Sequence, residues 1–200
     1  MDNASGQHMV NIRYITVTAM LSAVAFILMF LDFSVPIMPA FIKMDISELP
    51  ALIGAFSMGP VCGVIVCLVK NLLHLLITTT GGVGELSNFI LGAIFVFPAG
   101  WIYKRKKTKK RALLGSLCGA VLMAAASVLT NYFIVYPFYT MLMPMDEIIS
   151  MYQAIFPPVN GLLDCLIVFN MPFTFFKGIL SAAVTFLLYK HISPVLKGWS

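Results

Sequence analysis

Two long apolar runs lie on either side of a basic segment in the stretch ELSNFILGAIFVFPAGWIYKRKKTKKRALLGSLCGAVLMAAASVLTNYFIVY, residues 85–136. The apolar runs, 85–103 and 112–136, have about the length of roughly 20 residues that a helix needs to cross a bilayer. The segment between them, 104–111, holds seven of the thirteen Lys and Arg residues of the chain. Because basic loops between spans stay on the cytoplasmic side, this stretch predicts two membrane helices joined by a cytoplasmic loop.

The composition of the whole chain also indicates that the protein lies in a membrane. Of its 200 residues, 60% are hydrophobic and only 10% are charged, whereas a soluble domain carries about 25% charged residues. A chain this apolar has too little polar surface to cover itself in water, so we expect it to lie in lipid. We predict an all-α integral membrane protein with a single domain, residues 9–200. Residues 1–8 are polar and are interpreted as a remnant of an expression tag or a disordered tail before Met9.

The remaining apolar segments bring the expected number of transmembrane helices to six. With the 104–111 loop in the cytoplasm, both termini also fall inside, together with ten of the thirteen basic residues. Six of the eight acidic residues fall outside or at the outer boundary of the membrane. An arrangement with five spans would no longer separate the basic from the acidic residues in this way. The four other expected helices cover residues 14–31, 47–58, 61–77 and 172–189.

Irregular backbone collects on the predicted outer face. Pro36 and Pro39 exclude a continuous helix in segment 34–45, a Thr- and Gly-rich loop follows at 78–84, and prolines recur between 137 and 158. Non-helical backbone at membrane depth is tolerated where it lines a cavity or is buried in protein. Because segment 34–45 is too apolar for a free loop, we expect it to fold back over a ligand pocket that opens to the outside.

Polar side chains inside the predicted spans mark candidate functional positions, because a charge there costs about 2.5–3.5 kcal/mol on insertion scales. Lys177 either snorkels to the interface or contacts a ligand or a buried acid such as Asp164. Asn131 either bonds to a neighbouring helix or donates to a ligand. Three polar residues of the span 61–77 either support packing or belong to a site: Lys70, Asn71 and His74.

We find no catalytic or metal-binding motif in the sequence. The four cysteines form no CxxC pair and are interpreted as packed apolar side chains, and the three histidines are too scattered to suggest a metal site. The glycine-rich segment 81–85 is not a P-loop, because no GK[ST] follows it. A membrane-embedded enzyme would need paired carboxylates or histidines at one depth, whereas the acids here lie mostly in loops. We therefore expect no enzymatic activity.

Five stretches, taken in order, resemble one transporter family: KMDISELPALIGAFSMGPVCGV (43–64), VKNLLHLL (69–76), TTGGVGELSNFILG (79–92), TNYFIVYPFY (130–139) and MPFTFFKG (171–178). The chain resembles the riboflavin-specific, RibU-type S component of energy-coupling-factor (ECF) vitamin transporters, over nearly its whole length from Met9. The resemblance implies six transmembrane helices and a pocket near the outer face, capped by the loop after the first helix. It implies riboflavin as the transported ligand, no cofactor, and a place in the cell membrane of a prokaryote. The implied partners are a transmembrane coupling protein and two ATPases.

The resemblance also implies the residues of the site. Asn131 and Lys177 correspond to flavin contacts of the family. Thr174 stands where the family pattern PFN-x-x-K has an Asn, and its hydroxyl offers fewer hydrogen bonds than an amide. The capping segment implies further contacts from Met44, Asp45 and Leu49.

A second implied surface concerns the partner protein. Ala19 and Ala23 match an Ala-xxx-Ala motif on the first helix that contacts the coupling protein in the family. From the residues alone, small side chains at this spacing let another helix approach closely, either within this chain or from a partner.

The chemistry of riboflavin fits such a pocket, because a neutral flat ring with a polyhydroxyl tail needs an apolar slot with a few polar groups. Asp45, Glu85 or Asn88 would meet the ribityl hydroxyls, and Tyr132 belongs to an aromatic cluster that either forms an interfacial belt or stacks on the ligand. Thiamine or another vitamin is the alternative ligand, although a cationic ligand would favour an acidic pocket and Lys177 argues against one. A structural subunit without a ligand is a further alternative, which leaves Lys177 unexplained.

Overall fold

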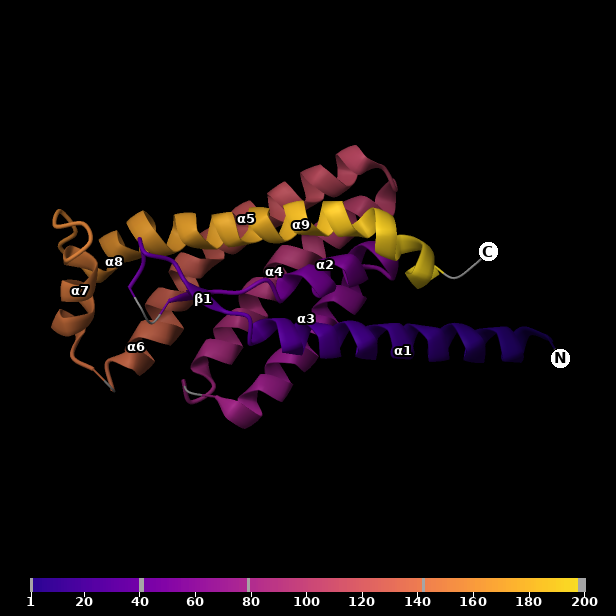
Figure 1. The fold of residues 1–200 in the computed structure, drawn as a ribbon, viewed down its shortest axis with the longest axis horizontal. Coiled ribbons are helices and arrows are strands. Elements are labelled where there is room, and N and C mark those ends of the chain that lie inside the picture. The colour runs from indigo at the N-terminus through magenta and orange to yellow at the C-terminus, as the bar shows by residue number, and fades with distance from the viewer. Residues whose placement is uncertain (1, 40–41, 79, 142, 198–200) are drawn as a thin grey trace.

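Long helices that lie roughly side by side form the body of the molecule (Figure 1). The structure is a computed structural model that describes residues 2–39, 42–78, 80–141 and 143–197, and the burial of side chains within residues 12–188. Its elements in chain order are α1 (Asp2–Met29), β1 (Phe33–Ser34), β2 (Lys43–Met44), α2 (Glu48–Ser57), α3 (Pro60–His74), η1 (Leu75–Ile77), α4 (Val83–Arg105), α5 (Lys109–Thr130), η2 (Asn131–Val135), α6 (Tyr136–Tyr139), α7 (Met145–Gln153), α8 (Leu162–Cys165), η3 (Leu166–Asn170) and α9 (Met171–Lys197).

Within the described part of the chain, five segments are helical and apolar over a length that could cross a membrane. They correspond to five of the six spans predicted from the sequence. The sixth predicted span is α2, whose 10 residues extend only about 15 Å and therefore do not cross a bilayer alone. Every α2 residue from Glu48 to Phe56 is buried, so this helix is a core element enclosed by the others. The five long segments are Ile12–Met29, Pro60–Ile77, Val83–Arg105, Lys109–Tyr139 and Leu162–Leu188.

Two of these long segments contain a turn of π-helix, which the sequence analysis did not predict. In one, η2 joins α5 to α6, and in the other, η3 joins α8 to α9. A π-turn adds a residue to the helical turn and so changes which side chains face the interior; such turns occur often at functional sites. Asn131 begins the first π-turn and Asn170 ends the second.

The predicted irregular segments carry more structure than expected. Segment 34–45 belongs to a short antiparallel hairpin in which Phe33 pairs with Met44. The stretch between the fifth and sixth expected spans, interpreted as a loop, contains the helix α7. Its buried residues Ile148 and Tyr152 are four apart and so face the same side. Together with Met38 of the hairpin segment, they join a second apolar cluster with residues of η2 and η3.

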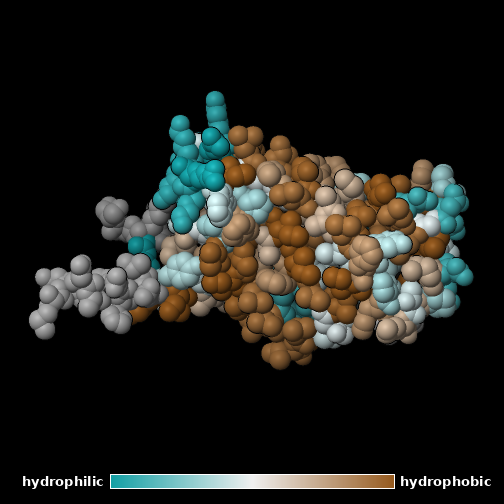
Figure 2. Space-filling model, turned by 180° about the vertical axis from the view of Figure 1, so that it is seen from behind, coloured by the Kyte–Doolittle hydropathy of each residue, from teal (hydrophilic) through white to brown (hydrophobic). Residues whose placement is uncertain are grey.

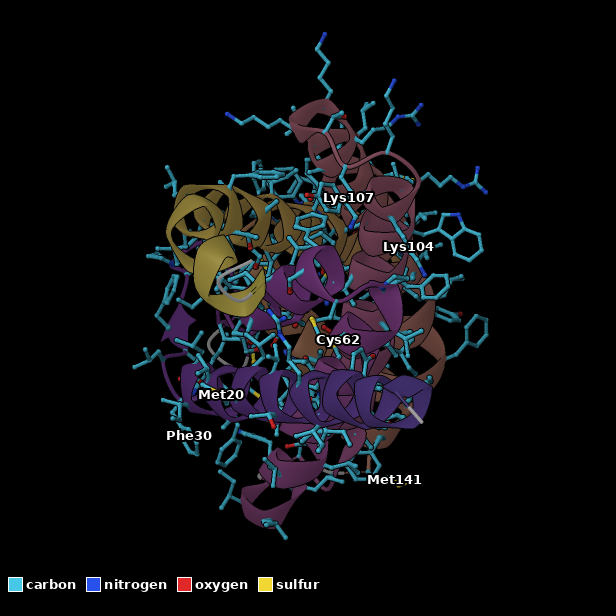
Figure 3. All side chains as sticks on the ribbon, turned by 90° about the vertical axis from the view of Figure 1, so that its right-hand side faces the viewer. Met20, Phe30, Cys62, Lys104, Lys107 and Met141 are labelled. Atoms are coloured by element: carbon cyan, nitrogen blue, oxygen red, sulfur yellow. The ribbon has the colours of Figure 1, made fainter. Side chains whose placement is uncertain are left out.

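One end of the bundle carries the basic segment 104–111, where α4 connects to α5. The first turns of α1 and the last turns of α9 lie at the same end as the α4–α5 connection (Figure 1). That end carries a hydrophilic group of side chains, whereas hydrophobic residues dominate the middle of the visible face (Figure 2). Seen from this end, long side chains project away from the helices near Lys104, at the end of α4, and Lys107, in the α4–α5 connection, whereas Cys62 lies between the helices (Figure 3). The hairpin, α6, α7 and α8 lie at the opposite end, which we call the cavity end.

Helices α4 and α5 approach closely because α5 presents glycines to α4. A Cβ atom at Gly119 would lie 2.3 Å from the carbonyl oxygen of Phe95, and one at Gly115 would lie 2.8 Å from that of Ala99. Small residues four apart allow this backbone-to-backbone contact inside a membrane. The contact fixes the spacing of the two helices that carry the polar residues described below.

We predict that Gly119→Ala destabilises the protein by about 1–3 kcal/mol, because the added methyl group forces the two backbones apart. Unfolding measured by titration with a denaturing detergent checks this. Gly161→Ala is the matched control, since nothing lies within 4 Å of a Cβ at Gly161, and it leaves stability unchanged within about 0.5 kcal/mol. Equal stability of the two variants would contradict the close packing of α4 and α5.

Candidate ligand-binding site

A cavity of about 200 Å³ lies at the cavity end of the bundle. It is enclosed by the hairpin segment, α2, the first half of α4, the end of α5 with η2 and α6, and the junction of η3 with α9. Its wall mixes aromatic and aliphatic side chains with a few amides, hydroxyls and charged groups, which is the composition expected of a small-molecule site. The residues that line it are Ile42, Lys43, Glu48, Gly84, Ser87, Asn88, Leu91, Met123, Asn131, Val135, Tyr136, Tyr139, Asn170, Phe173, Thr174 and Lys177.

Four of the nine residues predicted as ligand contacts line this cavity: Asn88, Asn131, Thr174 and Lys177. Ile42 and Lys43 also line it, so the segment after the first helix contributes to the wall as expected. Met44, Asp45 and Leu49 are buried next to lining residues but are not themselves among them. Glu85 and Tyr132 are likewise absent from the cavity wall.

Four buried charges form a connected network beneath the cavity. The Lys177 ammonium lies 2.9 Å from Asp45 Oδ2 and 3.3 Å from Glu48 Oε2. The Lys70 ammonium lies 3.0 Å from Glu48 Oε1 and donates to the hydroxyl of Ser47, which in turn donates to Asp45 Oδ1. The two positive and two negative side chains cancel in charge, so the group is neutral as a whole. We call Asp45, Glu48, Lys70 and Lys177 the charge quartet.

The quartet decides between the two interpretations of Lys177. Its side chain is 10% exposed and is held by carboxylates, so it does not snorkel to the interface. The expected partner Asp164 was wrong: this residue is exposed, and its carboxylate accepts from the backbone N–H of Asn160 at 3.4 Å. Lys70, which the sequence left open between packing and a site, belongs to the same network and is fully buried.

Asp45 stays ionised because of its partners. Burial by itself raises the pKa of this carboxyl group, but the nearby Lys177 and Lys70 and the hydrogen bond from Ser47 outweigh burial and hold the pKa well below its usual range. A carboxyl group with a lowered folded-state pKa stabilises the fold above its unfolded pKa of about 3.9 and loses this contribution as the pH falls below that value. The network is therefore intact throughout the neutral and mildly acidic range.

Asn131 bonds to its own helix and not to a neighbouring one, and it lies in the cavity wall, where a ligand contact stays a prediction. Its Nδ2 donates to the carbonyl oxygen of Ser127 at 2.8 Å, which is a bond to its own helix, and its side chain also lines the cavity. With one N–H directed to the backbone, the side-chain carbonyl and the second N–H are the groups that it offers to a ligand.

Glu85 has hydrogen-bond partners in the loop between α3 and α4 that were not predicted from the sequence. Its carboxylate accepts from Thr78 at 2.9 Å and Thr80 at 3.0 Å, and lies 2.8 Å from His74 Nδ1. It therefore fastens the loop between α3 and α4. The side chain of Tyr132 is 42% exposed and packs edge-on against Phe133, on the outer side of its helix.

Asn170, Tyr136 and Tyr139 also line the cavity, although the sequence did not single them out as ligand contacts. One signal for Asn170 was present: it precedes Thr174 by four residues and Lys177 by seven, the spacing of one helical face. The tyrosines belong to the aromatic cluster, but nothing in the pattern separated those that face inward from those that face lipid.

Over residues 13–189, the sequence matches the family described as ECF transporter, substrate-specific component. The chain belongs to this family. It is 37% identical over 187 residues to the protein named riboflavin transporter RibU of Staphylococcus aureus (strain TCH60), covering 94% of this chain and 93% of that protein. It is 28% identical over 186 residues to riboflavin transporter FmnP of Bacillus subtilis (strain 168), covering 92% of this chain and 93% of that protein.

A solved structure described as "Structure and mechanism of the S component of a bacterial ECF transporter" has the same fold, with a TM-score of 0.74 and 34% identity. The match covers 94% of this chain and 99% of the chain in the solved structure. The family is a component of a transporter and not an enzyme. Among the described residues, no group of three or more His, Cys, Asp or Glu side chains could hold a metal ion.

We predict that the quartet behaves as a unit in stability measurements. Lys70→Met leaves an unbalanced buried carboxylate and destabilises the fold by about 3–5 kcal/mol. Glu48→Gln combined with Lys70→Met removes both charges of one pair, so we expect the double variant to be more stable than Lys70→Met alone. Detergent-titrated unfolding of the two single variants and the double variant measures the coupling.

The control for this cycle is Lys43→Met. Lys43 forms an exposed ion pair with Asp32 at 2.9 Å, and such pairs contribute less than about 1 kcal/mol. If the Glu48 and Lys70 substitutions proved additive, the two side chains would not form the coupled pair described.

Proposed function

We propose that this chain is the riboflavin-capture subunit of an ECF-type importer, which takes up riboflavin from outside the cell and delivers it inward. The single observation that carries the proposal is the cavity, enclosed by aromatic side chains and a small set of amide, hydroxyl and ammonium groups. The chain that contains this cavity is 37% identical to a protein named riboflavin transporter, which supports riboflavin as the ligand.

The proposed contacts follow from the chemistry of the wall. The aromatic and aliphatic residues Tyr139, Phe173 and Leu91 offer surfaces for the flat ring. Asn131 and Lys177 bond to the carbonyl and nitrogen edge of the ring, and Asn88 meets ribityl hydroxyls. Because Asp45 already accepts from Ser47 and Lys177, its role is to hold Lys177 in place beneath the ligand.

Entry of the ligand requires the cavity to widen. Its volume of about 200 Å³ is below the roughly 300 Å³ at which ligand pockets for drug-sized molecules begin. The hairpin strands β1 and β2, which lead into the wall, have two residues each. We infer that the hairpin segment moves outward as riboflavin enters and returns to cap it.

Thiamine is disfavoured as the ligand by the charge balance. The quartet is neutral, and the carboxylate in the cavity wall, that of Glu48, is already paired with Lys70 and Lys177. A cationic ligand would have no unpaired carboxylate to bind there, and burying its charge without a partner is costly.

The proposed arrangement in the membrane places the basic end of the bundle in the cytoplasm and the cavity end outside. The concentration of Lys and Arg in residues 104–111 supports it through the positive-inside rule. In this arrangement both termini are cytoplasmic, and α2 forms the sixth helix of the domain without crossing the bilayer alone. The chain then works in the cell membrane with a transmembrane coupling protein and two ATPases.

Helix α1 is the proposed docking surface for the coupling protein. Ala19 and Ala23 are both exposed, so within the described residues they do not pack inside the chain. Small exposed side chains four apart leave a shallow groove into which a partner helix fits closely.

We predict that the chain purified alone in detergent carries or binds riboflavin, seen as visible absorption of the protein and as flavin fluorescence released on denaturation. Asn131→Leu weakens riboflavin binding by roughly tenfold, because it removes a hydrogen bond and leaves a polar atom of the ligand unpaired. Quenching of riboflavin fluorescence measures both affinities.

Asn160→Leu is the control for this measurement, since Asn160 is exposed and lies outside the cavity; its riboflavin affinity equals that of the unaltered chain. A colourless protein that also fails to quench added riboflavin would exclude the flavin assignment. Unchanged affinity of Asn131→Leu would exclude this residue from the site.

We predict that Ala23→Leu separates capture from transport. The larger side chain fills the groove on α1 and prevents close helix contact, while the cavity is unaffected. We expect unaltered riboflavin affinity in detergent and loss of riboflavin uptake in cells that express the complete transporter. Ala125→Leu, an exposed alanine on α5, leaves both properties unchanged, and uptake by Ala23→Leu at the unaltered rate would place the docking surface elsewhere.

A further inference from the structure

Three side chains form a hydrogen-bonded chain that runs from the outer helix α7 to the cavity wall. Tyr152 of α7 is fully buried and donates its hydroxyl proton to Asn170 Oδ1 at 2.8 Å. The hydroxyl of Tyr136 is hydrogen-bonded to that of Tyr152. Tyr136 and Asn170 line the cavity, whereas Tyr152 does not.

The number of protons available fixes the direction of this chain. Each tyrosine hydroxyl has a single proton to donate. Because Tyr152 directs its proton to Asn170, the bond between the two tyrosines must use the proton of Tyr136. Two consequences follow for the cavity wall. The oxygen of Tyr136 offers only lone pairs, and Asn170, whose carbonyl oxygen already accepts from Tyr152 and whose amide also donates to the Tyr136 oxygen, offers its remaining amide N–H.

The orientation of the Asn170 amide therefore depends on α7. Without the donor from Tyr152, the oxygen and nitrogen of this amide would be free to exchange places by rotation of the side chain. Tyr152 is held in turn by its ring contact with Phe169 at 5.1 Å and by the apolar cluster that it shares with Ile148. The end of η3 places Asn170 one turn before Thr174 on the same side of the helix.

We propose that Asn170 is a ligand-binding residue that donates an amide N–H to riboflavin, and that Tyr152 is the positioning residue that fixes its orientation. Asn170 supplies the side-chain amide that Thr174 lacks. The adjacent lone pairs of Tyr136 complete a donor and acceptor pair, which suits the ring edge of a flavin, where carbonyl acceptors alternate with an N–H donor. This inference rests on the proposed function and extends the site to a residue of α7 that never touches the ligand.

The test is a double-mutant cycle on riboflavin affinity. Tyr152→Phe keeps the ring and its packing but removes the proton that orients Asn170, and we expect roughly tenfold weaker binding. Asn170→Leu removes the amide, and we expect a loss at least as large. Since Tyr152 acts through Asn170, Tyr152→Phe has no further effect on affinity in the Asn170→Leu background.

A merely structural role for Tyr152 gives a different result. If Tyr152→Phe weakened binding only by loosening the fold, its effect would persist in the Asn170→Leu background and the two losses would add. Tyr103→Phe is the matched control, a tyrosine buried near the basic end of α4, and it leaves affinity unchanged. Additive losses, or an unchanged affinity of Tyr152→Phe alone, would overturn the proposal. Failure of the unaltered chain to bind riboflavin would instead overturn the proposed function.

Discussion

The charge quartet is the constraint around which the cavity end of this protein is organised. Four ionised side chains are placed where burial penalises each of them, and only their mutual neutrality makes the arrangement tolerable. Asp45 and Glu48 come from the connection between β2 and α2 and from the first residue of α2, Lys70 from α3 and Lys177 from α9. The requirement for neutrality therefore joins three segments that are distant in sequence, and it holds the short helix α2 inside the bundle although α2 is too short to span the membrane.

The same network gives the site its electrostatic character. An isolated lysine beneath a small cavity would attract anions, whereas a lysine already paired with two carboxylates presents a directed N–H donor with little net charge. A neutral ligand with carbonyl groups fits such a donor better than a charged one does. The proposed selectivity for riboflavin over a cationic vitamin thus follows from the pairing of Lys177 and not from its presence alone.

Departures from regular helix shape the other walls. The π-turns η2 and η3 occur where α5 and α9 reach the cavity, and they present Asn131 and Asn170 to it. Close contact of α4 with the glycines of α5 holds the part of the cavity wall formed by α4 close to the helix that continues into η2. Thr174 in place of the family's Asn becomes understandable in this setting, because an amide one turn earlier reaches the same cavity.

The sequence by itself determined the long membrane helices, the separation of the basic loop from the acidic and irregular end, and the candidates Asn131 and Lys177. These features follow from local properties, since hydrophobic length and the cost of an intramembrane charge are properties of each segment alone. Only the tertiary structure decided that Lys177 pairs with Asp45 instead of Asp164, that Glu85 fastens a loop, and that Tyr152 reaches Asn170. Ion pairing and hydrogen bonding depend on distances between segments far apart in the chain, and no local pattern of residues contains those distances.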